Sequence, residues 1–555
     1  MSKCIQLTIV LISFVLSCST GNKADLIITG GRVYTFDPAN PQAEAVAVRD
    51  GKIVMVGSAE KASILLGKKT RLIQLNGEMV LPGLIDAHAH LLSLGRNLSE
   101  LNLKETTSVP QIRQMVLDRQ KQISQGGWLT GRGWDQNDWA EKNYPTWNDL
   151  QGTESNPVYL RRVDGHAAWV NRTALEVCRI DKNTADPPGG RILRDAAGEP
   201  TGILIDNAVD LVSLKIPQPS VEDKTSWLMK AMAECNRYGL TGLHDMGIDS
   251  ANLEIYRTLE KEGKLTLRIY AVLSDEDTLF LKKYLQGGAG QDSSSDLQVK
   301  AMKLYADGAL GSRGALLLSP YSDDPKNSGL PVRTREYLAR FAGLAVENGF
   351  QVCTHAIGDA GNRAILDIFE DVLKDKLSED LRLRIEHAQV LAPSDIPRFA
   401  KLGVIASMQP THATSDMYWA EERIGPERIK GAYAWRKLLN QDARIAFGSD
   451  FPVEGTDPLW GVYAAVTRQD HEGWPEGGWH PEEKLSVEEA LGCFTIEAAY
   501  AGFAEDRQGS IQAGKLADFT ILNEDIFTIP PTGILNAEVA YTIIGGNIVY
   551  SQSKE

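Results

Sequence analysis

Short apolar runs alternate with amphipathic stretches through the middle of the chain, from about residue 82 to residue 507. The runs are rich in Val, Ile, Leu and Ala, as is typical of parallel strands buried on both faces. The stretches between them, such as Tyr337–Asn348 and Ala364–Leu377, have the periodicity of helices. This alternation predicts an α/β fold with a parallel sheet. We count eight candidate strands, the number in a closed (β/α)8 barrel of the TIM type: Leu84–Ala87, Gly239–His244, Leu267–Leu273, Val299–Leu304, Gln351–Thr354, Leu383–Glu386, Gly403–Met408 and Arg444–Phe447.

The two ends of the chain have a different texture from the middle. Residues 24–81 and 508–552 alternate between apolar and polar positions, which is typical of half-exposed strands. Asp50-Gly51 between two apolar runs predicts a hairpin turn. We therefore expect both ends to build one small β-sandwich domain, interrupted in sequence by the barrel at residues 82–507. The alternative is two unrelated hairpin extensions.

A long insertion separates the first two candidate strands, from about residue 91 to residue 237. A segment inserted after the C-terminal end of a barrel strand lies at the barrel mouth, so we expect a lid that selects substrates. The segment is rich in tryptophan, including Trp134, Trp139 and Trp169. These indole rings suggest an apolar substrate group, and Trp169 is our candidate for contacting it. Core packing explains them equally well.

Composition and charge restrict the partners. The 555 residues are 43% hydrophobic and 24% charged, and their formal net charge of −15 argues against nucleic acid or an anionic membrane surface as a partner. The six cysteines are too sparse for a disulfide framework. Cys353 is expected to be a buried structural thiol, although strand alternation also allows it to face the same way as His355.

The N-terminus has the pattern of an export signal. Lys3 precedes the apolar run Ile5–Leu16, which is too short to span a bilayer. The run leads to Cys18 in a segment that resembles a bacterial lipobox. Residues 1–18 are therefore predicted to be a lipoprotein-type signal peptide, with Cys18 as the lipidated residue and only anchor to a membrane. An ordinary cleaved signal, giving a soluble periplasmic or secreted protein, is the alternative.

Ionisable side chains stand at or near the ends of several candidate strands. His88 and His90 are separated by one residue, so in a strand they face the same way and are able to bind one metal ion. The C-terminal ends of barrel strands meet at one mouth. The same set of strand ends therefore brings together Lys303, His355, His387 and Asp450. Each alone is explained by a structural hydrogen bond, whereas coincidence is a poor explanation for all six.

These residues and the phrases around them resemble the metal-dependent amidohydrolases. The phrases Lys303-Leu-Tyr-Ala-Asp-Gly, His355-Ala-Ile-Gly-Asp and Ile385-Glu-His-Ala-Gln are similar to the amidohydrolase 3 branch, which includes N-substituted formamide deformylases. The resemblance implies one or two divalent ions, expected to be Zn²⁺. It assigns His88, His90 and Asp450 to one ion and His355 and His387 to a second, with Lys303 bridging both as a carboxylated lysine. An unmodified Lys303 near a single metal is the alternative.

The expected activity is hydrolysis of a C–N bond in an amide, an N-substituted formamide or a cyclic amide by a metal-activated hydroxide. Asp450 is the expected base. His166 is a candidate donor to the carbonyl or oxyanion, with plain lid packing as its alternative, and Arg313 and His412 are candidates for binding polar substrate groups. Two other functions stay open: hydrolysis of esters or other carbonyl compounds, and ligand binding by a non-catalytic surface lipoprotein. The partner is a small molecule, and a homodimer fits the scaffold.

Overall fold

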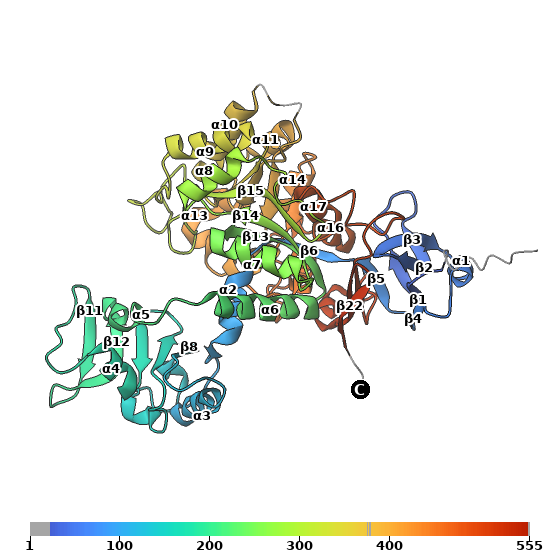
Figure 1. Ribbon diagram of the computed structural model, residues 1–555. Helices are drawn as coiled ribbons and strands as arrows, with labels where there is room; N and C mark the ends of the chain where they lie inside the picture. Colours follow the sequence, from blue (N-terminus) through green and yellow to red (C-terminus); the bar gives the residue numbers. More distant parts are fainter. Residues whose placement is uncertain (1–22, 375, 377–378, 553–555) are drawn as a thin grey trace, which may run out of the picture.

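The computed structural model of the chain describes residues 23–374, 376 and 379–552. The predicted signal peptide and Cys18 lie outside these residues. Three parts are visible in Figure 1: a central barrel with its helices, a small sheet domain on one side and an inserted lobe on the other. Within the described residues, we find no helix with the length and apolar character needed to cross a bilayer.

The barrel consists of eight parallel strands, as the sequence predicts. Neighbouring strands pair in chain order, and each overlaps one of the predicted runs. The observed bounds are β6 (Leu84–Ala89), β13 (Leu240–Ile248), β14 (Arg268–Leu273), β15 (Leu297–Tyr305), β16 (Gln351–Ala356), β17 (Arg384–His387), β18 (Ile405–Met408) and β19 (Ile445–Phe447).

The first and last barrel strands meet along a seam made by individual hydrogen bonds. The backbone N–H of Asp450 donates to the carbonyl of His88 (2.8 Å), and that of His90 donates to the carbonyl of Phe451 (2.9 Å). The Ser449 hydroxyl donates to the buried Asp86 carboxylate at 2.6 Å. A Cβ on Gly448 would lie 2.4 Å from the His88 nitrogen, so only glycine permits this approach. The seam thus joins the two strands at the residues where the predicted ligands stand.

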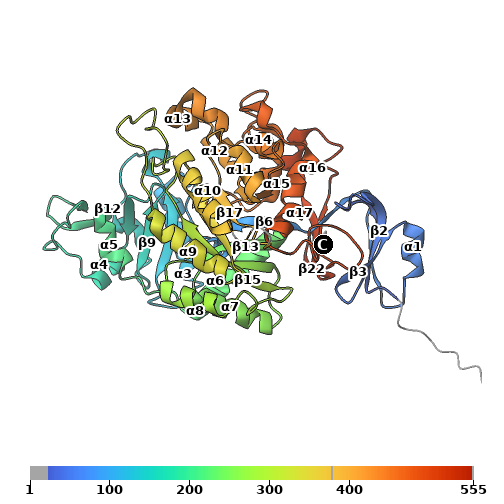
Figure 2. The same cartoon turned by 90° about the horizontal axis from the view of Figure 1, so that it is seen from above.

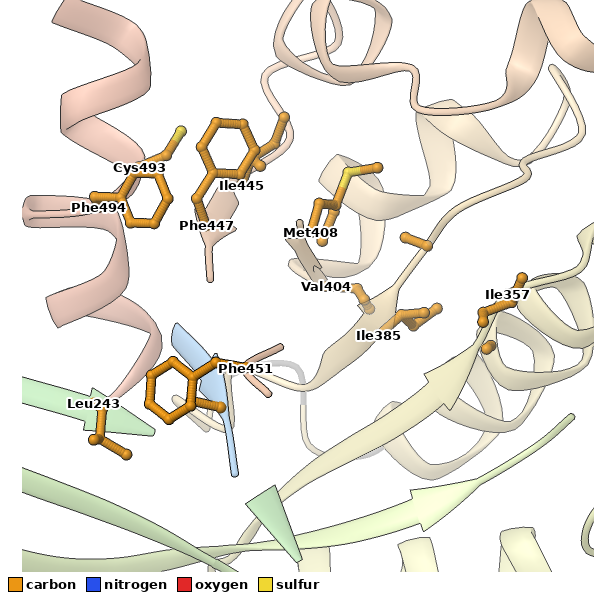
Figure 3. Close-up of a cluster of buried hydrophobic side chains, with 14 of the residues drawn as sticks. Leu243, Ile357, Ile385, Val404, Met408, Ile445, Phe447, Phe451, Cys493 and Phe494 are labelled. Atoms are coloured by element: carbon orange, nitrogen blue, oxygen red, sulfur yellow. The ribbon is translucent and has the colours of Figure 1, made fainter. Parts of the chain in front are cut away.

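Helices surround the barrel and bury its outer face. Figure 3 shows part of this layer, where Phe447 of the last strand lies beside Phe494. The Phe447 and Phe494 ring centroids lie 5.7 Å apart. The surrounding helices are α7 (Ser250–Lys261), α8 (Thr278–Gln286), α9 (Arg335–Glu347), α10 (Asp359–Leu373), α11 (Ile396–Leu402), α12 (Pro410–Asp416), α13 (Ala420–Arg428), α14 (Trp435–Leu439), α15 (Pro458–Thr467), α16 (Val487–Cys493) and α17 (Ile496–Ala501).

The two chain ends form one mixed sheet. Its strand order is β22-β21-β20-β5-β1-β2-β3, with β4 also paired to β1. Val80 pairs with Val33 on one side and with Ile521 on the other, so residues from both ends are neighbours. Asp50 and Gly51 form the predicted turn, both with positive φ. The bounds are β1 (Leu26–Tyr34), β2 (Gln42–Arg49), β3 (Lys52–Gly57), α1 (Ala59–Ile64), β4 (Arg71–Gln74), β5 (Met79–Pro82), β20 (Phe519–Leu522), β21 (Val539–Ile544) and β22 (Asn547–Ser551). Figure 2 shows α1 beside this sheet.

The insertion is a lobe with its own sheet and its own apolar core. We call the elements from β7 to α5 the inserted lobe. Its sheet has the order β11-β12-β10-β9-β8-β7, and the lobe stands to one side of the barrel in Figure 1. The bounds are β7 (Leu101–Asn102), α3 (Val109–Gln120), β8 (Leu129–Trp134), β9 (Val158–Arg162), β10 (Ala167–Val170), α4 (Arg172–Cys178), β11 (Gly190–Arg194), β12 (Pro200–Asp206) and α5 (Asp210–Ser213).

Two packed helices, α2 (Leu91–Ser99) and α6 (Val221–Arg237), connect the lobe to the barrel. They touch at Gly95, where a Cβ would lie 2.0 Å from the Trp227 carbonyl oxygen. Because α2 begins directly after His90, the connection to the lobe starts at the barrel mouth.

Candidate metal centre

Asp450 lies at the centre of the side chains that end the barrel strands. Its Oδ1 is 3.2 Å from Nε2 of His90 and 3.6 Å from Nε2 of His88. Its Oδ2 is 3.7 Å from Nε2 of His412. Two groups therefore have ligand atoms close enough to share an ion: His88, His90 and Asp450, and His387, His412 and Asp450.

Three imidazoles are held in one tautomer by oxygen acceptors. Nδ1 of His88 donates to the Glu386 carboxylate at 2.6 Å, and Nδ1 of His90 donates to the Met246 carbonyl at 3.0 Å. Nδ1 of His387 lies 2.7 Å from Oε1 of Gln409. With the proton on Nδ1, each ring keeps a lone pair on Nε2. This is the arrangement that metal-binding histidines typically adopt.

Two of the residues in the cluster have an unusual backbone conformation. His387 and Asp450 have φ angles of 74° and 60°, in the left-handed region that favours glycine. Such strain typically persists where the surroundings fix it, often at functional sites. His387 ends β17, and Asp450 lies three residues beyond the end of β19. The sequence carries no signal for this conformation.

Burial keeps the imidazoles neutral. Burial lowers the pKa of His88 to about 4 and that of His355 to about 3, and the positive charge of the nearby Lys303 is the second cause of both shifts. Burial and the neighbouring His355 also lower the pKa of His387 well below its usual value. Burial opposes ionisation of Asp450, but its close contact with His90 and the nearby His88 and His387 hold its pKa well below the usual range. Neutral imidazoles around an ionised carboxylate are metal ligands.

Lys303 reaches the same cluster from β15. Its side chain is 1% exposed, and Nζ lies 3.4 Å from Nε2 of His88. No carboxylate forms an ion pair with it among the residues the structure describes. Burial lowers its pKa, which favours the neutral amine.

The buried ion pair of Arg384 and Glu386 orients His88. Arg384 and Glu386 are both fully buried, and Nε of Arg384 donates to Oε1 of Glu386 at 2.8 Å. The other Arg384 nitrogens donate to the Ala87 carbonyl and to the Ser407 hydroxyl, and one lies 2.7 Å from Nδ1 of His244. His244 thus lies behind the ligands, in contact with the buried Arg384. Glu386 and Arg384 were not predicted to have a role, although charged residues inside an apolar strand indicate buried, paired groups.

His355 and His412 complete the cluster on the side away from His90. The His355 and His387 ring centroids lie 4.6 Å apart, and those of His387 and His412 lie 5.9 Å apart. Nε2 of His355 and Nε2 of His412 are buried and have no hydrogen-bond partner among the described residues. The expected pairing of His355 with His387 therefore stays a prediction, and His412 has a ligand position that the sequence analysis did not assign.

The structure does not bring the remaining predicted residues to this cluster. Trp169 is fully buried in the core of the inserted lobe, with Nε1 donating to the Thr146 carbonyl at 2.9 Å. Its predicted contact with substrate is therefore wrong, because no surface of the ring is available. Arg313 pairs with Asp323 at 2.8 Å. His166 is exposed in the lobe and lies 2.9 Å from Asp206. A catalytic role for His166 would require the lobe to move over the mouth and stays a prediction.

The cluster has the chemistry of a divalent-metal site. It offers unprotonated Nε2 atoms, buried imidazole nitrogens without partners and one ionised carboxylate, and nitrogen and oxygen donors of this kind suit Zn²⁺ and related ions. Cys353, by contrast, is buried beside Tyr270 and Val272, with Sγ 3.4 Å from Oε1 of Gln351. It is the structural thiol that we expected.

Comparison with known proteins agrees with this geometry. The model of the amidohydrolase family matches residues 71–550, so the chain belongs to this family, in the amidohydrolase 3 branch. It is therefore a metal-dependent hydrolase that acts on C–N bonds.

Three similar proteins cover nearly the whole chain. "Protein LONG AFTER FAR-RED 3" of Arabidopsis thaliana is 36% identical over 96% of this chain and 92% of its own length. The "N-substituted formamide deformylase" of Arthrobacter pascens is 26% identical over 95% of this chain and 99% of its own. The crystal structure of an "uncharacterized metal-dependent hydrolase" from Pyrococcus horikoshii OT3 has a TM-score of 0.74 and 29% identity, and covers 91% of this chain and 99% of that one.

Proposed function

We propose that this protein hydrolyses a non-peptide amide, with N-substituted formamides as the first substrates to test. The observation that carries the proposal is the position of Asp450, whose two carboxylate oxygens face His90 and His88 on one side and His412 on the other. The similarity to the Arthrobacter deformylase supports the choice of substrate class.

The metal is proposed to be Zn²⁺, held by His88, His90 and Asp450, with a second ion bound by His387 and by His355 or His412. A divalent ion lowers the pKa of a coordinated water towards neutrality and polarises a carbonyl group. Lys303 is proposed to be carboxylated, so that it presents two anionic oxygens to both ions. Its burial without a carboxylate partner supports this assignment, because an ammonium would repel cations, whereas a neutral amine reacts with CO2.

Asp450 is proposed to transfer the protons of the reaction. Asp450 is ionised, so it accepts a proton from the attacking water and later donates that proton to the departing nitrogen. Its Oδ1 faces His88 and His90, and its Oδ2, 3.7 Å from Nε2 of His412, is the oxygen proposed to exchange the proton. Glu386 and the Met246 carbonyl keep His88 and His90 in their binding tautomer throughout.

We further propose that the protein is exported and anchored by a lipid on Cys18. The charged Lys3, the short apolar run Ile5–Leu16 and the following Cys18 support this assignment. Labelling of cells with a radioactive fatty acid would test it, with Cys18→Ser as the matched control. A protein that remains in the cytoplasm would contradict it.

Purified protein supplied with Zn²⁺ and bicarbonate is the material for the functional test. A panel of N-formyl, N-acyl and cyclic amides, with matched esters, identifies the bond that is cleaved. Asp450→Asn should abolish turnover while the circular-dichroism spectrum stays unchanged, because the amide does not accept a proton. Cleavage of esters alone, or metal-free protein that only binds the compounds, would contradict the proposal.

A further inference from the structure

Tyr305 lies beside the candidate metal centre, and the proposed hydrolysis gives it no role so far. It is the last residue of β15, two positions beyond Lys303, so the two side chains face the same way. Its ring centroid lies 5.6 Å from that of His355 and 5.1 Å from Nζ of Lys303.

The phenol ring extends across the mouth of the barrel towards β13. A Cβ on Gly247 would lie 3.6 Å from the Tyr305 hydroxyl. Gly247 follows Met246, whose carbonyl holds His90. The Tyr305 ring therefore lies beside His355, and its hydroxyl lies close to β13, the strand whose Met246 carbonyl holds His90.

The Tyr305 hydroxyl has no hydrogen-bond partner among the described residues, although the side chain is half-buried. Tyrosine hydroxyls that leave bulk water usually find an acceptor. Six other tyrosines donate from their hydroxyls to a protein oxygen: Tyr256, Tyr270, Tyr284, Tyr321, Tyr433 and Tyr463. The buried Tyr159 has no such bond among the described residues, but it lies in the inserted lobe and not at the cluster. Packing against His355 would be served equally well by phenylalanine, so the packing does not account for the hydroxyl.

We propose that Tyr305 is a catalytic residue whose hydroxyl donates a hydrogen bond to the carbonyl oxygen of the substrate. This inference rests on the proposed amide hydrolysis. As the nucleophilic oxygen bonds to the carbonyl carbon, the π electron pair moves onto the carbonyl oxygen, where Tyr305 stabilises the charge. The pair returns when the C–N bond breaks, and the nitrogen takes its proton from Asp450. Tyr305 keeps its own proton throughout.

The two donors predicted from the sequence are not available for this role in the observed arrangement. Arg313 is bound to Asp323, and His166 is exposed in the inserted lobe. Tyr305 thus supplies the neutral donor that the cluster of ligands and bases otherwise lacks.

The test compares Tyr305→Phe with wild-type protein, both loaded with Zn²⁺. We expect kcat to fall about 100-fold with KM changed less than about threefold, because the hydrogen bond strengthens in the transition state. Metal content and melting temperature should be unchanged. Binding of a phosphonate analogue, measured by calorimetry, should weaken by a similar factor, whereas binding of the carboxylate product should not. Tyr337→Phe on the outer helix α9 is the matched control.

Several results would overturn the inference. If Tyr305→Phe has the same kcat as the wild-type protein, Tyr305 has no catalytic role, and the proposed function is unaffected. Loss of bound Zn²⁺ would mean that Tyr305 only supports His355. If wild-type protein cleaves no amide, the proposed function fails, and equal phosphonate binding by both proteins would then reject the role of Tyr305 separately.

Discussion

The Glu386 carboxylate lies 2.6 Å from Nδ1 of His88 and is itself bound by Arg384. The ligand, its acceptor and the cation behind it are all fully or almost fully buried. The orientation of His88 is therefore set by an ion pair that does not itself touch the metal.

Glu386→Gln should weaken metal binding and destabilise the fold. The variant removes the charged acceptor of His88, which typically costs 10- to 100-fold in metal affinity. It also leaves Arg384 buried without its counterion, a loss of about 3–5 kcal/mol. Zinc titration and denaturant unfolding measure the two effects. Glu370→Gln, at an exposed ion pair with Arg398, is the control and should change stability by less than about 1 kcal/mol. Unchanged zinc affinity in Glu386→Gln would contradict the role of the pair.

Replacement of Lys303 should distinguish a carbamate from an ammonium. If the side chain is carboxylated, Lys303→Glu retains part of the bound metal, whereas Lys303→Arg loses it because the guanidinium repels the ions. Both variants should lose at least about 100-fold in kcat/KM if the bridge orders the site. Metal analysis and intact mass, which would reveal one added CO2 in the wild type, are the measurements. Better metal retention by the arginine variant would favour an unmodified lysine.

The metal-free protein should lose stability as the solution becomes acidic. The pKa of His88 is lowered to about 4 and that of His355 to about 3 from the ordinary 6.5, and the pKa values of His244 and His387 are also well below it. The unfolded chain binds these protons near pH 6.5 and the folded chain does not. This contribution to stability is therefore complete above about pH 6.5 and is lost as the pH falls towards the folded values.

Melting curves of the metal-free protein between pH 7.5 and pH 4.5 test this expectation. The four histidines should take up protons on unfolding near pH 5, whereas the buried Asp86, Asp307 and Asp457, whose pKa values burial raises to about 7, 6 and 6, should release protons and offset part of that uptake. Added Zn²⁺ should raise the melting temperature at pH 7.5, since it binds only the folded state. Imidazole NMR signals of these histidines that titrate between pH 7 and pH 5 in the folded protein would contradict the expectation.

Trp169→Ala should destabilise the inserted lobe locally. The indole is fully buried against Trp134, with ring centroids 6.1 Å apart, so the cavity should cost about 3–5 kcal/mol. Hydrogen exchange should accelerate in β8 to β12 and stay slow in the barrel strands. Trp474→Ala, at a half-exposed indole, is the control. If Trp169→Ala instead raised KM with the exchange rates unchanged, Trp169 would contact the substrate after all.

The barrel could be predicted from the sequence because parallel strands buried on both faces are continuous apolar runs, and Lys303, His355 and Asp450 interrupt that pattern at or near strand ends. The pairing of both chain ends followed from their shared alternation. Both predictions rest on residue patterns within single strands, which do not depend on long-range packing.

Long-range packing could not be predicted in the same way. Trp169 is equally compatible with a substrate pocket and with a core, and only the sheet of the inserted lobe decides between them. The partnership of Glu386 with His88 joins residues 298 positions apart. The left-handed backbone of His387 and Asp450 depends on the neighbouring strands and has no counterpart in residue type.

The seam between β6 and β19 has a consequence for the order of synthesis. His88 and His90 leave the ribosome early, but the carboxylate that completes their cluster follows some 360 residues later, after the whole of the rest of the barrel. The small sheet that packs beside the barrel also needs its last strands from beyond residue 519. A growing chain, or one that ends before Asp450, therefore has no finished centre, and any ion it captures is bound by an incomplete set of ligands.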